Sequence, residues 1–169
     1  MRRAFTLIEL LITIGMFVVI TAVALYIFKV VLLTWSSQEN REGGNVLISR
    51  GVESMARTLR SASAIPSLYS NEIRFTVEEN GADVNYIYYL YNLSDTYVPP
   101  PAFNQSSYQL RKAALTGFTY GSGDIVLIDV LPPPASELSV SGNMATVDLS
   151  VRSGVETVRS RMRIRPRNL

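Results

Sequence analysis

Residues 10–28 read LLITIGMFVVITAVALYIF and contain no charged side chain. Lys29 follows, and residues 30–33 are again apolar, with the sequence VVLL. A helix rises about 1.5 Å per residue, so roughly 20 apolar residues cross a hydrocarbon core ~30 Å thick. Arg2 and Arg3 precede the run, and the positive-inside rule therefore places the N-terminus in the cytoplasm. The stretch predicts one transmembrane helix, with the rest of the chain on the outer side.

Two common N-terminal segments also fit part of this pattern. A secretory signal peptide would be cut after Ala22-Val23-Ala24, but the apolar run continues to Leu33 and Glu9 interrupts its start. A signal anchor explains the hydrophobicity and the topology. It offers no reason for Glu9, because an ionisable group at membrane depth is costly and usually has a partner. The interpretation of the whole segment therefore depends on Glu9.

The residues around Glu9 resemble a known family. Arg2-Arg3-Ala4 followed by Phe5-Thr6-Leu7-Ile8-Glu9-Leu10 resembles the leader and mature start of type IV pilins and type II secretion pseudopilins. The resemblance implies that prepilin peptidase cuts between Ala4 and Phe5 and methylates the new amine of Phe5. Ala4 departs from the pattern, because most members have Gly before the cut. The resemblance also implies that Glu9 pairs with the Phe5 amine of a neighbouring subunit, an attraction that a low dielectric strengthens.

A long helix is expected to continue past the membrane, since no proline occurs between Phe5 and Ile65. Its weak points are Gly15 and Gly43-Gly44, and Pro66 predicts that it stops just after Ile65. Beyond the double glycine, apolar residues recur at three- and four-residue steps: Ile48, Val52, Met55, Leu59 and Ala62. This half is amphipathic, and the stripe is predicted to pack on a sheet of the same chain rather than on a neighbouring subunit.

The period changes to two after the helix, which predicts strands. Residues 72–77 and 85–91 flank Asn80-Gly81 and predict a β-hairpin. Further strands are expected at 108–112 and 125–130, and a second hairpin at 145–151 and 155–164, whereas the two triple-proline segments, 98–102 and 131–135, predict loops. The tyrosines of 85–91 predict a half-exposed sheet face, with a sugar-contacting or aromatic-contacting surface as the alternative.

The predicted fold class is α+β: a long N-terminal helix, with a transmembrane half and an amphipathic half, packed on an antiparallel β-sheet. The expected divisions are a leader at 1–4, a transmembrane helix at 5–34, an exported amphipathic half at 35–65 and a β-domain at 66–169. This layout is pilin-like. The strings IRFTVEENGADVNYIYYLYN, YQLRK and VRSRMRIRPRNL resemble the J-type minor pseudopilins and related minor pilins.

Composition argues against an enzyme. The chain has no Cys and no His, so it lacks the commonest zinc ligands and the usual general base near neutral pH. Asp124 and Asp129 near Gly121 and Gly123 lack the spacing of a calcium loop. No metal and no cofactor are therefore expected. Without Arg2 and Arg3 the 16 basic residues fall to 14, equal to the 14 acidic ones, so the global charge predicts no polyanionic partner.

A row of arginines near the end of the chain is the main candidate for a partner surface. The members alternate with other residues in an extended segment and are Arg159, Arg161, Arg163, Arg165 and Arg167. They form either the solvated outer face of a strand, where charge discourages aggregation, or a contact for an acidic subunit. Nucleic acid is not expected as a partner, because no aromatic side chains interleave with the arginines.

These patterns together predict a non-enzymatic minor pseudopilin that primes or caps a type II secretion pseudopilus. The alternatives are a minor pilin of a type IV pilus, acting in adhesion, motility or DNA uptake, and a binding module on a signal anchor. The resemblance implies three kinds of partner: prepilin peptidase, other pseudopilins or pilins, and an inner-membrane assembly platform. It also implies a bacterial inner-membrane location with a periplasmic or extracytoplasmic C-terminal domain, followed by residence in a filament.

Overall fold

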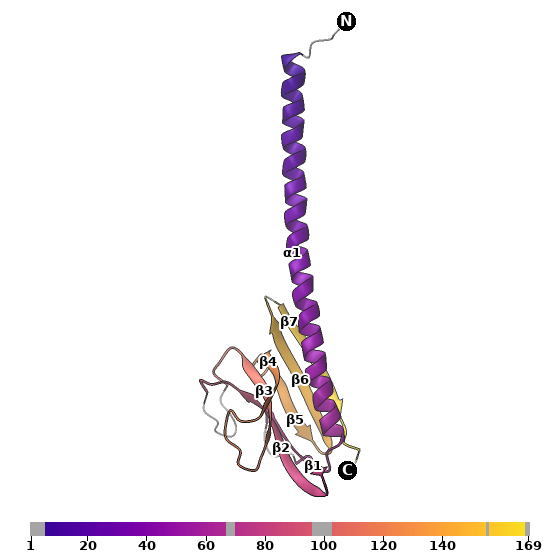
Figure 1. Cartoon of the computed structure of the whole chain (residues 1–169), viewed down its shortest axis with the longest axis vertical. Helices are drawn as coiled ribbons and strands as arrows, with labels where there is room; N and C mark the ends of the chain where they lie inside the picture. Colours follow the sequence, from indigo (N-terminus) through magenta and orange to yellow (C-terminus); the bar gives the residue numbers. More distant parts are fainter. Residues whose placement is uncertain (1–5, 67–69, 96–102, 155, 168–169) are drawn as a thin grey trace. The chain divides into compact units, whose positions relative to one another are not determined.

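The computed structural model describes residues 6–66, 70–95, 103–154 and 156–167. In these ranges one helix precedes seven strands (Figure 1): α1 (Leu7–Arg60), β1 (Glu72–Glu79), β2 (Ala82–Tyr91), β3 (Tyr108–Ala114), β4 (Asp124–Val130), β5 (Glu137–Ser141), β6 (Met144–Ser153) and β7 (Glu156–Ile164). The chain divides into two compact units, Met1–Glu39 and Asn40–Leu169, and α1 contributes to both. The predicted α+β class, a long N-terminal helix packed on an antiparallel sheet, is confirmed.

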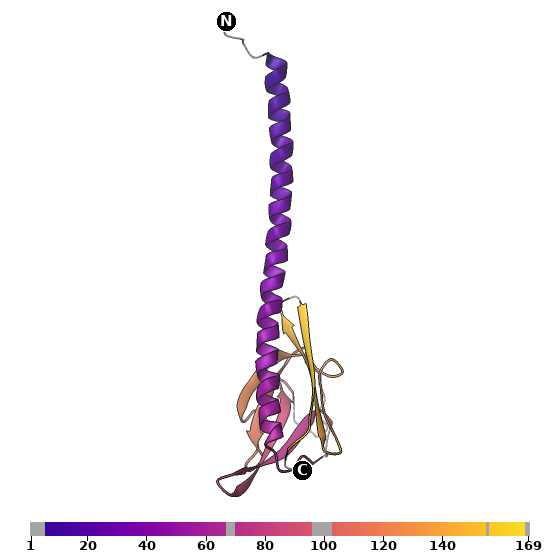
Figure 2. The same cartoon turned by 90° about the vertical axis from the view of Figure 1, so that its right-hand side faces the viewer.

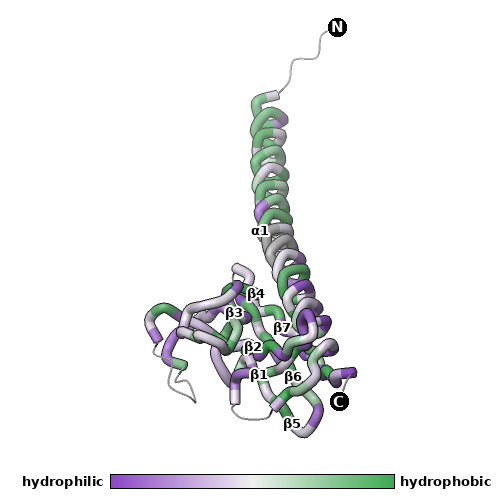
Figure 3. Tube along the Cα trace, turned by 60° about the horizontal axis from the view of Figure 1, so that its bottom comes forward, coloured by the Kyte–Doolittle hydropathy of each residue, from purple (hydrophilic) through white to green (hydrophobic). Residues whose placement is uncertain are grey.

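The first unit contains the apolar part of α1. Leu7–Trp35 is 29 residues long, and its most apolar stretch has a mean hydropathy of 2.6, so this part of α1 is long and apolar enough to cross a membrane. None of it is buried within the chain, and Figure 3 colours most of it hydrophobic. The hydroxyls of Thr13, Thr21 and Thr34 donate to the carbonyls four residues earlier, at 2.7, 2.8 and 2.9 Å. These three threonine hydroxyls thus find their acceptors within the helix, as an apolar solvent requires.

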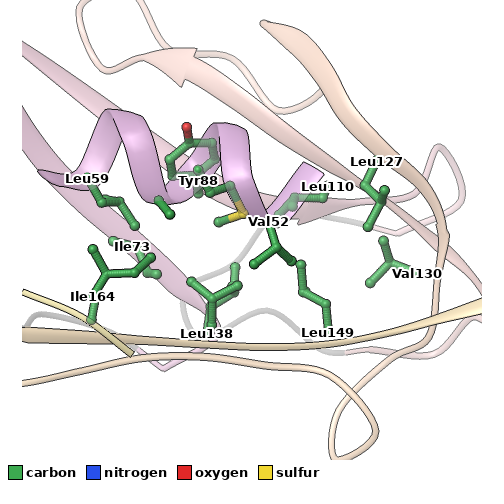
Figure 4. Packing of buried hydrophobic residues seen from close by; sticks show 14 of the residues in the cluster. Val52, Leu59, Ile73, Tyr88, Leu110, Leu127, Val130, Leu138, Leu149 and Ile164 are labelled. Carbon is green, nitrogen blue, oxygen red and sulfur yellow. The ribbon is translucent and has the colours of Figure 1, made fainter. Parts of the chain in front are cut away.

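The second unit is built around the remaining part of α1. The predicted stripe is confirmed, because Ile48, Val52, Met55, Leu59 and Ala62 are all 1% exposed or less. The charged residues between them, Glu53, Arg57 and Arg60, are exposed. Figure 4 shows this helix face packed against buried side chains from both early and late strands. They include Ile73, Tyr88, Leu138, Leu149 and Ile164. Burial of this helix face against the sheet is what stabilises the domain.

All the strand pairings are antiparallel, in the order β1-β2-β3-β4-β6-β5, with β7 on β6. β7 pairs with β6 along Ala145–Ser153, so β4 and β5 share the other edge of β6. β4 reaches β6 at a single pair, Val130 with Val151. The Asn71 N–H donates to the Leu138 carbonyl at 2.8 Å, which ties the chain before β1 to β5. Figure 2 shows the sheet curving round the end of α1.

The helix boundary differs from the prediction. α1 ends at Arg60 rather than at Ile65, because the next residues join the sheet. The Ser63 N–H donates to the Thr76 carbonyl at 2.8 Å, and the Thr76 N–H donates to the Ala64 carbonyl at 2.9 Å. Pro66 predicted the end of the helix, but the pairing of residues 63 and 64 with β1 ends α1 earlier. At both predicted weak points, Gly15 and Gly43-Gly44, α1 is continuous.

Both predicted hairpins are confirmed, as β1–β2 and β6–β7, and so are strands at the positions of β3 and β4. β5 was not predicted. Its five residues alternate weakly, and only Leu138 is buried. The strand is fixed by its neighbour β6, where Leu138 pairs with Val147, rather than by its own sequence. The loop prediction for 131–135 is confirmed, whereas that for 98–102 falls on positions outside the described residues.

The expectation of a half-exposed tyrosine face is wrong for its central residues. Tyr88 is 1% exposed beneath α1, and Tyr89, on the opposite face, is 2% exposed. The Tyr89 hydroxyl donates to the Ser122 carbonyl at 2.6 Å, and the Phe118 ring meets the Tyr89 ring edge-on at 5.2 Å. The segment between β3 and β4 therefore covers this face. Tyr89 thus belongs to a second small core, and Tyr88 belongs to the main core, so neither forms an open contact surface.

Candidate functional site

The start of α1 forms a capping box between Thr6 and Glu9. The Thr6 carbonyl accepts the first helical hydrogen bond, from the Leu10 N–H at 3.3 Å, so Thr6 is the N-cap residue. The Glu9 carboxylate accepts from the Thr6 N–H at 3.0 Å and from the Thr6 hydroxyl at 2.9 Å. The Glu9 N–H donates back to the Thr6 hydroxyl at 3.4 Å. This reciprocal pattern satisfies donors that every helix start leaves open.

The capping box corrects one step of the sequence argument. A plain signal anchor seemed to leave Glu9 without a reason, whereas the structure supplies one within the same chain. The T-x-x-E spacing that produces it is visible in the sequence as Thr6-Leu7-Ile8-Glu9. Glu9 is exposed, so its carboxylate is also open to a partner outside the chain. Ala4 and Phe5, the predicted processing residues, lie outside the described residues.

The arginine row divides into two parts. Arg159, Arg161 and Arg163 lie on the face of β7 opposite Met162 and Ile164, as the alternation predicted. Arg159 forms a two-bond pair with Asp148 on β6, with both N···O distances at 2.8 Å, and Arg161 approaches the same carboxylate at 3.6 Å. Asp148 is 4% exposed, so these arginines cover a buried charge of their own domain. Arg165 and Arg167 follow the end of the strand and are exposed.

The Asp148 pair is the best-defined electrostatic contact of the domain. Hydrogen bonding from Arg159 holds the pKa of the Asp148 carboxyl below its ordinary value of 3.8, and the charges of Arg159 and Arg161 act in the same direction. The fork of a guanidinium matches the two oxygens of a carboxylate, which makes this geometry stronger than a single contact. Arg159 and Arg161 thus have a structural use, which the sequence did not reveal because Asp148 lies on another strand.

A second anchored group lies at the base of the segment between β2 and β3. The Tyr108 hydroxyl donates to the Asp95 carboxylate and accepts from the Gln105 N–H at 2.9 Å. Burial and the hydrogen bond to Asp95 raise the pKa of Tyr108 to about 12. The Phe103 ring packs edge-on against Tyr108 at 5.3 Å. Tyr108 therefore clamps both ends of this connection.

A third group of charged residues lies where α1 ends. Arg57, Arg60, Ser61 and Arg167 line a depression of about 320 Å³, which we call the arginine depression. The Arg167 N–H donates to the Arg60 carbonyl at 3.1 Å and holds the C-terminal segment against the helix end. Sequence reasoning placed Arg57 and Arg60 only on the polar side of the helix. Their convergence with Arg167 depends on a contact between distant parts of the chain.

The two aspartates considered for calcium lie at opposite ends of β4. Asp124 pairs in register with Lys112, and Asp129 has a left-handed φ of 55° at a shift in the register between β3 and β4. Across the described ranges, no group of three or more His, Cys, Asp or Glu residues is placed to hold a metal ion. The geometry of these aspartates is that of a strand start and a strand irregularity.

Comparison with known proteins identifies no relative of this chain: no family model, no curated protein and no solved structure matches it.

Proposed function

We propose that the chain is a minor pseudopilin, a non-enzymatic subunit that primes or caps a type II secretion pseudopilus. One observation carries the proposal: an apolar helix of 29 residues has no cover from its own chain, and its first turn holds a carboxylate, Glu9. Lipid can cover such a helix in the membrane, and the helices of neighbouring subunits can cover it in a filament. The second unit, which contains the end of α1 and all the strands, has its own core and so remains folded in either setting.

The proposed sequence of events follows the resemblance of the N-terminus to prepilins. The chain inserts in the bacterial inner membrane with its N-terminus in the cytoplasm and its C-terminal domain outside. Prepilin peptidase cuts between Ala4 and Phe5, and the new Phe5 amine is methylated. Glu9 then pairs with the Phe5 amine of a neighbouring subunit, because each charge is costly when it is alone at low dielectric. An assembly platform moves the subunit into the filament. A minor pilin of a type IV pilus would follow the same steps.

A binding module on a signal anchor is the second candidate, and the capping box favours it. Thr6 and Glu9 satisfy one another within a single chain, so Glu9 does not require a filament. The two functions differ in what Glu9 must supply. A cap needs a side-chain acceptor, whereas pairing with an amine needs a negative charge.

Mass spectrometry of the mature N-terminus, in a bacterial host that has prepilin peptidase, is the first test. The filament proposal predicts a chain that begins at an N-methylated Phe5. An intact Met1, or a chain that begins after Ala24, would rule the proposal out.

Two substitutions separate the cap from the charge. Glu9→Gln keeps a capping box, because Gln at this position also reaches the N-cap, but removes the charge. Thr6→Val removes the cap hydroxyl and keeps the carboxylate. Filament assembly predicts that both variants enter the membrane and that only Glu9→Gln is lost from purified filaments. If Glu9→Gln co-purifies with filaments normally while Thr6→Val does not, Glu9 acts as a cap and its pairing with the Phe5 amine is rejected. Absence of the parent chain itself from purified filaments would favour the anchored module.

A further inference from the structure

The arginine depression gathers positive charge from two distant parts of the chain. Arg57 and Arg60 belong to the last turn of α1, and Arg167 follows β7. Ile164 and Pro166 are buried, which anchors the segment and leaves Arg165 and Arg167 exposed. Figures 1 and 2 show the end of α1 beside the C-terminal end of the chain, and Figure 3 colours this region hydrophilic. The backbone bond from Arg167 to Arg60 makes the arrangement part of the fold.

The domain places little negative charge near the arginine depression. Arg57 pairs with Glu53 one turn away at 3.1 Å, but the two side chains are 82% and 70% exposed, so the pair is weak. Within the described part of the chain, neither Arg60 nor Arg167 has a carboxylate within 4.0 Å. Two other arginines of the domain do have a close carboxylate: Arg74 pairs with Glu72 at 2.7 Å and Arg159 with Asp148 at 2.8 Å.

A helix end by itself accounts for only part of the cluster. The carbonyls of a last turn attract cations, which explains Arg57 and Arg60. It does not explain why the chain brings a third arginine from the far end of the sequence to the same depression. A larger depression, of about 450 Å³, lies along α1, but there Asp124 accompanies Arg50 and Lys112. Among the described residues, no acidic side chain lines the arginine depression.

We propose that the arginine depression binds the carboxylates of an acidic protein segment. Guanidinium groups recognise carboxylates in pairs of parallel hydrogen bonds, and three of them at one depression suit several carboxylates of one chain. A volume of about 320 Å³ exceeds what one small ion fills, since a water molecule takes about 30 Å³. The described lining of the depression holds no aromatic ring of the kind on which the bases of single-stranded nucleic acid stack.

The test uses the full chain in detergent micelles and a fluorescein-labelled octaglutamate peptide, with binding followed by anisotropy. We expect saturable binding that weakens as salt rises. Arg57→Gln, Arg60→Gln and Arg167→Gln together are expected to weaken it about tenfold, as three exposed ion pairs would. A control with the same charge change, Arg50→Gln, Arg152→Gln and Arg163→Gln, is expected to stay within about twofold of the parent chain. Equal losses in the two triple variants would overturn the proposal.

The chemistry of the partner is tested separately. Arg57→Lys, Arg60→Lys and Arg167→Lys together keep the charge and lose the planar fork, so an intermediate loss of about threefold is expected. An unchanged affinity would show that the depression recognises charge alone and would contradict recognition by paired guanidinium hydrogen bonds. Octathymidylate or inorganic phosphate that displaces the peptide at a lower concentration than unlabelled octaglutamate would point to a phosphate ligand instead and reject the acidic protein segment.

A footprint on the unsubstituted chain covers the case in which a variant fails to fold. Phenylglyoxal modifies exposed arginines, and mass spectrometry locates each modified site. Octaglutamate is expected to protect Arg57, Arg60 and Arg167 while Arg50 and Arg152 stay reactive. Uniform protection, or none at the depression, would contradict the proposal without any substitution.

Discussion

At the scale of single residues, Asp148 shows how a buried charge is kept in this domain. Its carboxylate lies on β6 and is held by Arg159 through both oxygens. Replacing Asp148 by Asn keeps the shape and removes the charge. We expect a loss of about 1–2 kcal/mol in the free energy of unfolding at pH 7, because a hydrogen bond to a charged group is lost while Arg159 remains solvated. Denaturant unfolding of the full chain in detergent measures the difference.

The pH dependence of that difference follows from the lowered pKa of Asp148. The unfolded carboxyl has an ordinary value of 3.8, and the folded one lies below it. The stabilisation is therefore fully present above about pH 5 and is lost as the pH falls through the folded pKa. The gap between the parent chain and Asp148→Asn should be constant from pH 7 to about 5 and close below about 4.

Tyr108 is a second residue whose hydroxyl has an identifiable use. Tyr108→Phe keeps the ring against Phe103 and removes the bonds to Asp95 and Gln105. We expect a loss of about 1 kcal/mol and faster cleavage by protease between β2 and β3. Tyr86→Phe is the matched control, because its hydroxyl bonds only the exposed Glu79. Equal protease sensitivity in the two variants would show that the hydroxyl of Tyr108 does not hold this segment.

At the scale of elements, the double glycine of α1 has two different environments. A Cβ on Gly44 would lie 2.7 Å from the Ser153 Cβ and 3.0 Å from the Val158 Cγ2, so α1 approaches the β6–β7 hairpin there too closely for a side chain. A Cβ on Gly43 would meet nothing within 4 Å. Gly43 thus only lowers the stability of the helix, whereas Gly44 allows the close contact between α1 and the hairpin.

The two alanine substitutions should therefore act in opposite directions. Gly43→Ala removes a glycine from a helix interior and is expected to stabilise the domain by about 0.5–1 kcal/mol. Gly44→Ala gains the same propensity but forces the helix and the hairpin apart, at a cost of about 1–3 kcal/mol. Thermal unfolding should give a higher midpoint for the first variant and a lower one for the second. Two equal increases would mean that the hairpin moves away without cost.

Elements also show what sequence patterns can predict. The period of α1 and the alternation of the two hairpins are local, because each depends on side chains a few residues apart. β5 has no such signal, since its place is set by pairing with β6. The cover over Tyr89 has none either, because Phe118 and Ser122 come from a turn whose position depends on β3 and β4. Local patterns therefore predict which elements form, and tertiary contacts decide which faces they bury.

The candidate sites divide in the same way. The capping box lies within four consecutive residues, and its spacing is sufficient to predict it. The arginine depression joins residues more than a hundred positions apart, through a backbone bond from Arg167 to Arg60. The structure also changes the interpretation of the arginines on β7, because Arg159 is paired with Asp148 of the same domain. The arginine depression at the end of α1 is therefore the more open cationic surface.

At the scale of the whole molecule, the two units differ in how much of their apolar surface is exposed. Most apolar side chains of Leu7–Trp35 are more than 50% exposed, for example Phe17 at 70% and Tyr26 at 69%. The second unit buries most of its large apolar residues, and its main core runs from Ile48 to Ile164 with no member from the first unit. The part of the chain that needs an apolar environment is thus separate from the part that folds around a core.

This separation predicts that a chain that begins at Asn40 folds in water without detergent. It keeps the last 21 residues of α1 and all the strands, which is enough chain for an independent core. We expect a soluble monomer with strand and helix signals in circular dichroism and a cooperative thermal transition. A matched fragment that begins at Val52 lacks Ile48 and the Gly44 contact, so its midpoint should fall by several degrees. Aggregation of the Asn40 chain at every pH and salt would show that the domain needs the apolar helix to fold, and would contradict the division of the molecule at residue 39.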